Sequence, residues 1–483
     1  MMVVVVVVTG ALYFNSTLSF SSLAPIRPKY IPTLKILPLL SPFPTSPHFP
    51  RGAVLESRCP SFLTSTPPWK LSGTPDVFQD LPVNATGKDG KKYKIILYWN
   101  EIYGNKYFGL GYGHTPFVLA GCRVNTCLAT GDRHRYPLEE VDAVMWHLRS
   151  NDKSLPKKRY PHTYYVFWMM ESASYPFADL RAYRDKFNLT FTYRRDSDAF
   201  NPYGQLFLRR HPLPLPAKPI NYAKGKTKMA AWFVSNCHTK SRREDFVSRL
   251  KAWIKVDVFG GCGKLKCERS NHGQCLEMLE KDYKFYFSFE NSLCQDYVTE
   301  KFFNAMTVNV IPVVYGFGNY SAIAPPHSYI NALDFPTPRK LADFLLYLDG
   351  NDTAYNEYFW WKPYYHQTHD WAKKSMAFCE LCERLHDGTR KSYDLKKWFI
   401  DDSHCMGSYD EAVGRGRARV ARSVIVGVCV GIIVASFLVC ISCLVYGVFV
   451  SSPQQTRLAR CEDCVVPVTT NAPSLRQRLR QGG

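Results

Sequence analysis

The chain has 483 residues, more than one hydrophobic core usually organises, so its length predicts two packed domains with additional tails. Aromatic residues make up 14% and charged residues 21% of the sequence, and this composition excludes a chain that is disordered throughout. Lys and Arg number 61 against 41 Asp and Glu, and the net charge of +20 favours an anionic partner. Because no basic stretch is interleaved with aromatic residues as in nucleic-acid modules, we expect a nucleotide or sugar phosphate and no nucleic acid.

Two segments at the start of the chain are predicted to lie outside the folded part. Residues 1–19 open with an apolar run that lacks a preceding basic region, which predicts a weak signal or anchor segment. Residues 20–92 begin with a stretch rich in Pro, Ser and Thr that has neither helical nor alternating periodicity. This composition is typical of an extended stem.

Short apolar runs alternate with helix-like segments from residue 93 onward. YKIILYW, VDAVMWH and YYVFWMM are typical of buried parallel strands. Four prolines in residues 211–221 indicate a domain boundary, after which KMAAWFVS, VDVFG, KFYFSF and VNVIPVVYG continue the alternation. We therefore expect an α/β fold with two Rossmann-like domains, over residues 93–215 and 216–410, facing a cleft. Ligands of such domains lie at the carboxyl ends of the strands.

The apolar segment near the end of the chain has its own prediction. Residues 423–450 carry no charge over 28 positions, and at 1.5 Å rise per residue this exceeds the hydrocarbon thickness of a bilayer. We predict a membrane-spanning helix there, followed by a tail over residues 451–483. More Arg residues precede this segment than follow it closely, which by itself would place the large domain in the cytoplasm. N-glycosylation patterns favour the secretory lumen instead, and they occur at Asn84, Asn188, Asn319 and Asn351.

Cysteine usage also favours the lumen. Eleven of the 16 cysteines precede the apolar segment, and several have short spacings, as in disulfide-bonded proteins of oxidising compartments. The disulfide candidates, whose pairing stays open, include Cys122, Cys127, Cys379 and Cys382. The alternative is a zinc site formed by the two C-x-x-C pairs, which begin at Cys379 and Cys461. A membrane between these pairs would prevent them from sharing one ion, so we expect no metal site.

The stretch FYFSFENSLCQDYVTEKFFNAM, residues 285–306, begins as a strand and ends as a helix, with polar side chains at the junction. The start of a helix carries partial positive charge and favours an anion. Lys301 offers a point charge for a phosphate, Glu300 can accept hydrogen bonds from sugar hydroxyls, and Tyr297 can pack against a flat ligand. A helix start with surface ion pairs is the structural alternative.

This junction belongs to a longer block, residues 285–330, that resembles the signature of the α1,3-fucosyltransferases, in which FENS, DYxTEK and xPVVxG occur in this order. FNLTFTYRRDSDAFNPYG (187–204) and WFVSNCHTKSRREDFVSRL with VDVFGGCG (232–263) resemble two further blocks of the family. The likeness runs from about Tyr93 to Cys405.

The resemblance implies a GT-B-type glycosyltransferase with an acceptor-side first domain and a GDP-fucose-binding second domain. Such an enzyme moves L-fucose from GDP-β-L-fucose to the 3-hydroxyl of N-acetylglucosamine in glycoprotein glycans, with inversion. The implied partners are GDP-fucose, GlcNAc-containing acceptors and a membrane. No cofactor and no essential divalent metal are expected, and the implied location is the Golgi membrane with a lumenal catalytic domain.

The resemblance also implies which residues bind the donor. Arg243 and Lys301 match cations that contact the diphosphate, and Arg242 is the neighbour that can be confused with Arg243. Glu300 and Tyr297 match positions at the ribose or the fucose. Further positions match the lining of the donor pocket, namely Tyr203, Ser235, Asn236, Tyr286 and Asn291. Ordinary packing is the alternative for this last group.

An inverting transfer needs a carboxylate or a His that accepts the proton of the acceptor hydroxyl. Glu171 in FWMMESAS resembles the catalytic Glu of the family's E-S-P segment, although Ala173 stands where Pro is usual. A helix cap or a surface charge is the alternative for this Glu. Asp196 and Asp198 look like the acid-x-acid metal site of other glycosyltransferases, but the flanking arginines favour internal salt bridges.

Two other functions fit parts of the sequence. One is a catalytically inactive relative that acts as a membrane lectin or scaffold, and the retained acidic and basic motif residues argue against it. The other is transfer from a different nucleotide sugar, which the fold allows and the fucosyltransferase-like block disfavours. The acceptor can be the chitobiose core of N-glycans or an antennary disaccharide.

Overall fold

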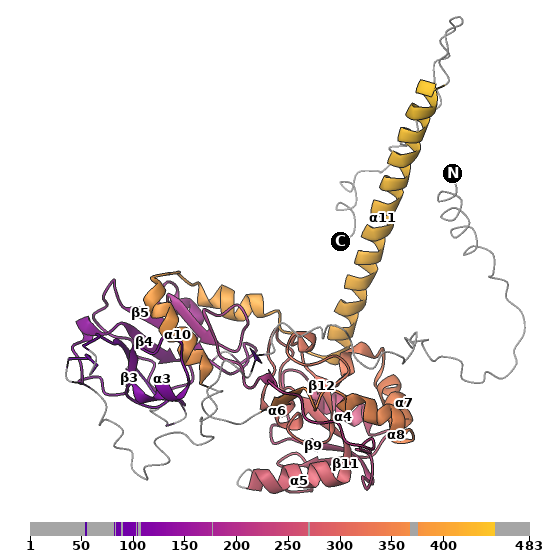
Figure 1. The fold of residues 1–483 in the computed structure, drawn as a ribbon, viewed down its shortest axis with the longest axis horizontal. Coiled ribbons are helices and arrows are strands. Elements are labelled where there is room, and N and C mark those ends of the chain that lie inside the picture. The colour runs from indigo at the N-terminus through magenta and orange to yellow at the C-terminus, as the bar shows by residue number, and fades with distance from the viewer. Residues whose placement is uncertain are drawn as a thin grey trace, which may run out of the picture. The chain divides into compact units, whose positions relative to one another are not determined.

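The computed structural model describes residues 54–55 and 82–449, apart from gaps at 83, 88–89, 103, 105–107, 176, 269–270 and 368–374 (Figure 1). The predicted signal segment, most of the predicted stem and the predicted tail lie outside the described residues. The second C-x-x-C pair, which begins at Cys461, lies outside them as well.

The first domain is built on a six-stranded parallel sheet with the order β3-β2-β4-β5-β6-β7. Every residue of the central strands β4 and β5 is buried, as expected for a parallel sheet that is covered on both faces. The strands are β2 (Lys94–Tyr98), β3 (Cys127–Thr130), β4 (Ala143–His147), β5 (Tyr164–Met169), β6 (Leu189–Thr192) and β7 (Ala199–Phe200). Short helices between them are α3 (Thr115–Leu119), η3 (Leu138–Glu140) and η4 (Leu180–Tyr183).

The second domain has a five-stranded parallel sheet with the order β10-β9-β11-β12-β13. Its central strand, β11, buries all seven residues between its neighbours. The strands are β9 (Lys228–Phe233), β10 (Val256–Phe259), β11 (Tyr283–Phe289), β12 (Ile311–Tyr315) and β13 (Ile330–Asn331). The helices of this domain are α4 (Arg243–Leu250), α5 (His272–Asp282), α6 (Glu300–Ala305), η6 (Tyr320–Ala322), η7 (Ala332–Asp334), α7 (Pro338–Asp349), α8 (Asp352–Asn356) and η8 (Glu357–Phe359). The α/β prediction is confirmed.

Residues after the second sheet return to the first domain. Helix α10 (Met376–Asp387) contributes Phe378 and Leu381 to the core of the first sheet, and Figure 1 shows this orange helix beside the indigo strands β4 and β5. The short helices η9 (Lys396–Ile400) and η10 (Asp401–Ser403) follow, and Phe399 packs in the same domain. The chain therefore crosses between the two halves more than once.

A third sheet was not anticipated from the sequence. It pairs β8 (Leu206–Leu208) with β14 (Tyr365–Gln367) in antiparallel orientation and with β1 (Val54–Leu55) in parallel orientation. Its strands have only two or three residues each, too few to show a periodicity in the sequence.

A long helix, α11 (Tyr409–Phe449), covers most of the segment predicted to span a membrane over residues 423–450. Among the residues that the structure describes, no helix has both the length and the apolar character that a membrane crossing needs. The prediction of a membrane-spanning helix over residues 423–450 is therefore not confirmed among these residues.

The ten described cysteines before α11 form five disulfides. The candidates pair across the chain, because β3 and the residues just before it lie against α10. The five bonds are Cys122–Cys379, Cys127–Cys382, Cys237–Cys262, Cys267–Cys275 and Cys294–Cys405. The prediction of disulfides at the four candidate cysteines is confirmed.

Candidate active site

The polar residues singled out in the sequence follow two buried strands of different domains. Glu171 comes two residues after the end of β5, and Asn291 comes two residues after the end of β11. Helix α4, which begins at Arg243, and helix α6, which contains Lys301, start near the end of β11. Carboxyl ends of parallel strands are where α/β proteins bind ligands, so this is the candidate site.

Arg243 and Arg242 have different surroundings despite being adjacent. The Arg243 side chain is buried, and its guanidinium donates to the Phe289 carbonyl at 2.6 Å and to the Asn236 carbonyl at 3.2 Å. Its Nε has no hydrogen-bond partner among the described residues. Arg242 is exposed in a left-handed backbone conformation and pairs with Asp245 at 2.7 Å. Burial lowers the pKa of Arg243. Because its guanidinium lies at the carboxyl end of β11, Arg243 is the arginine of the candidate site.

Lys301 lies among oxygen acceptors at the start of α6. Its Nζ donates to the Thr299 hydroxyl at 2.8 Å, and it lies 3.2 Å from a carboxylate oxygen of Glu290 and 3.2 Å from one of Glu300. Burial opposes the charged ammonium, but the two carboxylates outweigh it and raise the pKa of Lys301. Lys301 also lowers the pKa of the partly exposed Glu300, against the effect of its partial desolvation, so both groups carry charge.

Glu290 is a site residue that the sequence analysis did not identify. Its side chain is 0% exposed and accepts hydrogen bonds from the Thr299 amide at 2.8 Å and the Thr299 hydroxyl at 2.9 Å. Burial raises the pKa of this carboxyl, and Lys301 counteracts that effect. A signal was present in the sequence, because Glu290 is the acidic residue that directly follows the uncharged run FYFSF.

The loop that carries Glu171 is held by several hydrogen bonds within the first domain. The Tyr203 hydroxyl donates to the Met170 carbonyl, and the Ala173 amide donates to the Tyr193 hydroxyl at 3.4 Å. Proline has no amide hydrogen, so a proline at position 173 could not make this bond. Glu171 itself lies 4.0 Å from Arg149, and 28% of its side chain is exposed.

The same loop contacts the second domain. The Ser172 hydroxyl lies 3.1 Å from Sγ of Cys294, and the Tyr175 hydroxyl accepts a hydrogen bond from the Lys240 amide at 3.2 Å. Burial and the nearby Glu171 carboxylate raise the pKa of Tyr203, and Glu300 and Glu290 add to this increase. Tyr203 bonds to the residue before Glu171, and its ring lies edge-on to that of Tyr297 at 6.2 Å, so the Glu171 loop lies near the residues that follow β11.

The other predicted donor-pocket residues differ in exposure. Tyr297 is buried, with its ring edge-on to Tyr193 at 5.0 Å, and Tyr286 is buried in β11 against Phe233. Burial raises the pKa of both hydroxyls. Ser235 and Asn236 are exposed in the loop after β9, and the buried side-chain oxygen of Asn291 has no partner among the described residues.

The acid-x-acid pair is occupied by internal partners. Arg194 binds both carboxylate oxygens of Asp196, at 2.8 and 2.7 Å, which confirms the predicted salt bridge. Asp198 is buried and accepts from Lys391 at 2.6 Å, from the Tyr393 hydroxyl at 2.7 Å and from Thr190. The carboxylates are therefore committed to protein donors.

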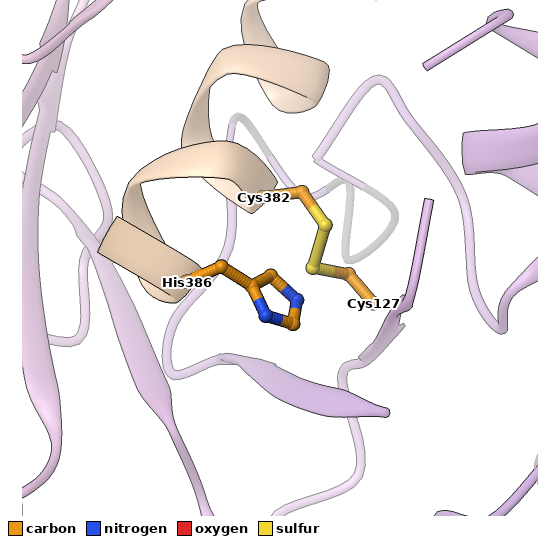
Figure 2. Close-up of side chains that lie close together, drawn as sticks. All are labelled: Cys127, Cys382 and His386. Atoms are coloured by element: carbon orange, nitrogen blue, oxygen red, sulfur yellow. A yellow bond between two sulfur atoms is a disulfide. The ribbon is translucent and has the colours of Figure 1, made fainter. Parts of the chain in front are cut away.

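Cys127, Cys382 and His386 bring potential metal-ligand atoms within 4.8 Å of one another. Figure 2 shows that the two sulfur atoms are joined in a disulfide and that the imidazole lies beside it. His386 Nε2 contacts the Thr126 hydroxyl at 3.1 Å. Because a metal is bound by thiolates and not by a disulfide, this group has no thiolate to offer an ion.

Comparison with known proteins gives consistent matches over both domains. The model for glycosyltransferase family 10 (fucosyltransferase), C-terminal part, matches residues 223–398, and the fucosyltransferase N-terminal model matches residues 91–204. α-(1,3)-Fucosyltransferase C of Drosophila melanogaster is 38% identical over 337 residues, covering 64% of this chain and 78% of the relative. α-(1,3)-Fucosyltransferase fut-1 of Caenorhabditis elegans is 35% identical, and the match covers 67% of this chain and 72% of the nematode protein. Human 4-galactosyl-N-acetylglucosaminide 3-α-L-fucosyltransferase FUT6 is 35% identical, and the match covers 65% of this chain and 86% of the human protein.

Proposed function

Because the chain belongs to glycosyltransferase family 10, the fucosyltransferases, we infer that it is an α1,3-fucosyltransferase that takes L-fucose from GDP-fucose. The observation that carries this inference within the molecule is the grouping of two cations and the loop of Glu171 at the ends of β5 and β11. An inactive lectin or scaffold is not favoured, since Glu171, Arg243, Glu300 and Lys301 are all retained.

We further propose that the acceptor is the 3-hydroxyl of N-acetylglucosamine in glycoprotein glycans and that the transfer inverts the anomeric centre. The bond between fucosyl C1 and the β-phosphate oxygen breaks, and its electron pair leaves with GDP. The acceptor oxygen bonds to C1 from the opposite face. The two parallel sheets support a GT-B-type arrangement, with the acceptor on the first domain and the donor on the second.

Glu171 is proposed as the group that takes the proton of the acceptor hydroxyl. A sugar hydroxyl is a poor nucleophile, so a carboxylate within hydrogen-bond reach lowers the barrier by accepting that proton as the bond forms. Its side chain is partly exposed, so an acceptor can reach it. The hydrogen bond from Tyr203 to Met170 supports the backbone directly before the carboxylate.

Arg243 and Lys301 are proposed to bind the diphosphate and to stabilise the charge that develops as GDP leaves. Both are held by neighbouring oxygen atoms before any donor arrives, so their positions are fixed in advance. We propose that these cations make a divalent metal unnecessary. The commitment of Asp196 to Arg194, and of Asp198 to Lys391, supports this proposal.

We propose that the catalytic part lies in the lumen of the Golgi apparatus. Five disulfides fit an oxidising compartment, where glycoprotein glycans are also processed. Of the four sequons, Asn84 and Asn319 have exposed side chains.

A GDP-release assay tests these proposals. The purified chain is supplied with GDP-fucose and either a chitobiose-core or an antennary lactosamine acceptor, with and without a chelator. Wild type is compared with Glu171→Gln, which keeps the shape of the side chain and removes the base. We expect turnover with one acceptor class that survives chelation and falls at least about 100-fold in the variant. Absence of acceptor-dependent GDP release would contradict the proposed transfer, and loss of turnover on chelation would contradict the metal-free mechanism alone.

A further inference from the structure

The end of β11 holds both cations of the candidate site. The carbonyl of Phe289, the last residue of β11, accepts from Arg243 at 2.6 Å. The side chain of Glu290, the next residue, lies 3.2 Å from the Lys301 ammonium. The Glu290 carbonyl also accepts from the Ser241 hydroxyl at 2.8 Å, just before α4. Neighbouring residues of one strand end therefore hold helices α4 and α6 in place.

Glu290 cannot easily move. Its side chain is 0% exposed, and the Thr299 amide and hydroxyl donate to it at 2.8 and 2.9 Å. A buried carboxylate is costly unless it is paired and hydrogen-bonded, and here both conditions are met. Glu300, by contrast, is 53% exposed at the surface of the site.

The Lys301 ammonium has three N–H donors and faces three acceptors, at 2.8 Å (Thr299), 3.2 Å (Glu290) and 3.2 Å (Glu300). A phosphate oxygen can therefore bind this ammonium only if one acceptor gives way. Of the two carboxylates, the exposed Glu300 can rotate into solvent or toward a sugar hydroxyl, whereas the buried Glu290 cannot.

We propose that Glu290 is a positioning residue for the donor: it fixes the Lys301 ammonium and keeps it charged, while Glu300 releases that ammonium to the diphosphate. This inference rests on the proposed function, because it requires Lys301 to face the diphosphate of the nucleotide sugar. Glu290 itself touches neither the donor nor the acceptor.

The electrostatics of Lys301 agree with this role. Burial and Arg243 lower the pKa of Lys301, whereas Glu290 and Glu300 raise it, and the net direction is upward. A lysine with a raised pKa stays charged to higher pH. Removing Glu290 leaves only Glu300 to oppose burial and Arg243, which favour the neutral amine. Other titratable groups on neighbouring elements interact electrostatically with Glu290, namely Tyr203, Tyr286, Tyr297 and Tyr320.

The test measures GDP affinity of the purified full-length chain by titration calorimetry from pH 7 to 9.5. Glu290→Gln keeps the hydrogen-bond acceptor for Thr299 and removes the charge. We expect its dissociation constant for GDP to rise about tenfold more than that of wild type between pH 7 and 9, since an opposite charge at this range shifts a pKa by roughly 1–3 units. The matched control is Glu280→Gln in the last turn of α5, just before β11, where the Glu280 carboxylate accepts a hydrogen bond from Asn309. Deprotonation of guanine itself is common to all proteins in the series.

A merely structural role predicts a lower melting temperature with a pH profile parallel to that of wild type, and this result would overturn the inference. Glu290→Asp restores the charge, so it should restore the wild-type profile. If Glu290→Gln does not fold, the GDP affinities of wild type and Lys301→Gln are compared between pH 7 and 9. A constant ratio of the two affinities supports the inference. A ratio that falls means that Lys301 loses its proton beside Glu290, which overturns it. If wild type does not bind GDP, the proposed function is refuted as well. If wild type binds GDP and the Glu290→Gln profile is parallel to it, only the role of Glu290 is refuted.

Discussion

Replacing Arg243 by alanine should lower kcat/KM for GDP-fucose by about 30- to 1,000-fold. The guanidinium is buried and held by the Phe289 and Asn236 carbonyls, so its position is fixed before the donor binds. A preorganised cation at a leaving diphosphate contributes about 2–4 kcal/mol to transition-state stabilisation, and each 1.36 kcal/mol corresponds to a factor of ten. The same change leaves two carbonyl oxygens without this donor, which costs about 1–3 kcal/mol of unfolding free energy.

Arg242→Ala is the matched control, because it removes the same side chain one residue earlier. Arg242 is exposed, and its ion pair with Asp245 is worth no more than about 1 kcal/mol. We expect kcat/KM within about threefold of wild type. Both variants are assayed by GDP release at saturating acceptor, and their melting temperatures are measured so that only folded protein is compared. Equal losses in the two variants, or an Arg243→Ala enzyme within threefold of wild type, would refute the assignment of Arg243 to the donor.

Three further outcomes are expected. Replacing Cys294 and Cys405 together by serine should lower the free energy of unfolding by about 2–4 kcal/mol in urea, because the bond closes a loop with a sequence separation of 111; an unchanged midpoint would contradict this. Glycopeptide mass spectrometry of secreted protein should find glycan at the exposed Asn319 and none at Asn188, which is half-buried and bonded to the Tyr165 amide at 2.7 Å; a glycan at Asn188 would contradict this prediction. A chelator should leave kcat unchanged in the wild type, and restoration of a lost activity by a divalent ion would exclude the metal-free mechanism.

The sequence by itself determined much of the fold and the residue types of the site. Continuous apolar runs predicted the strands β2, β4, β5, β9, β11 and β12, because a parallel strand buried on both faces must be apolar at every position. The motif within residues 285–306 identified Lys301 and Glu300, because its residue types and their spacing are specific enough to be recognised without coordinates.

Only the tertiary structure decided which of these residues act on one another. It separated the buried Arg243 from the exposed Arg242, and it paired β3 with α10 through Cys127 and Cys382, which are 255 residues apart. It also made Glu290 the fixed partner of Lys301. Periodicity and motif spacing describe neighbours along the chain, whereas burial and charge pairing depend on which distant segments fold against each other. The chemistry of the candidate site arises from those distant contacts.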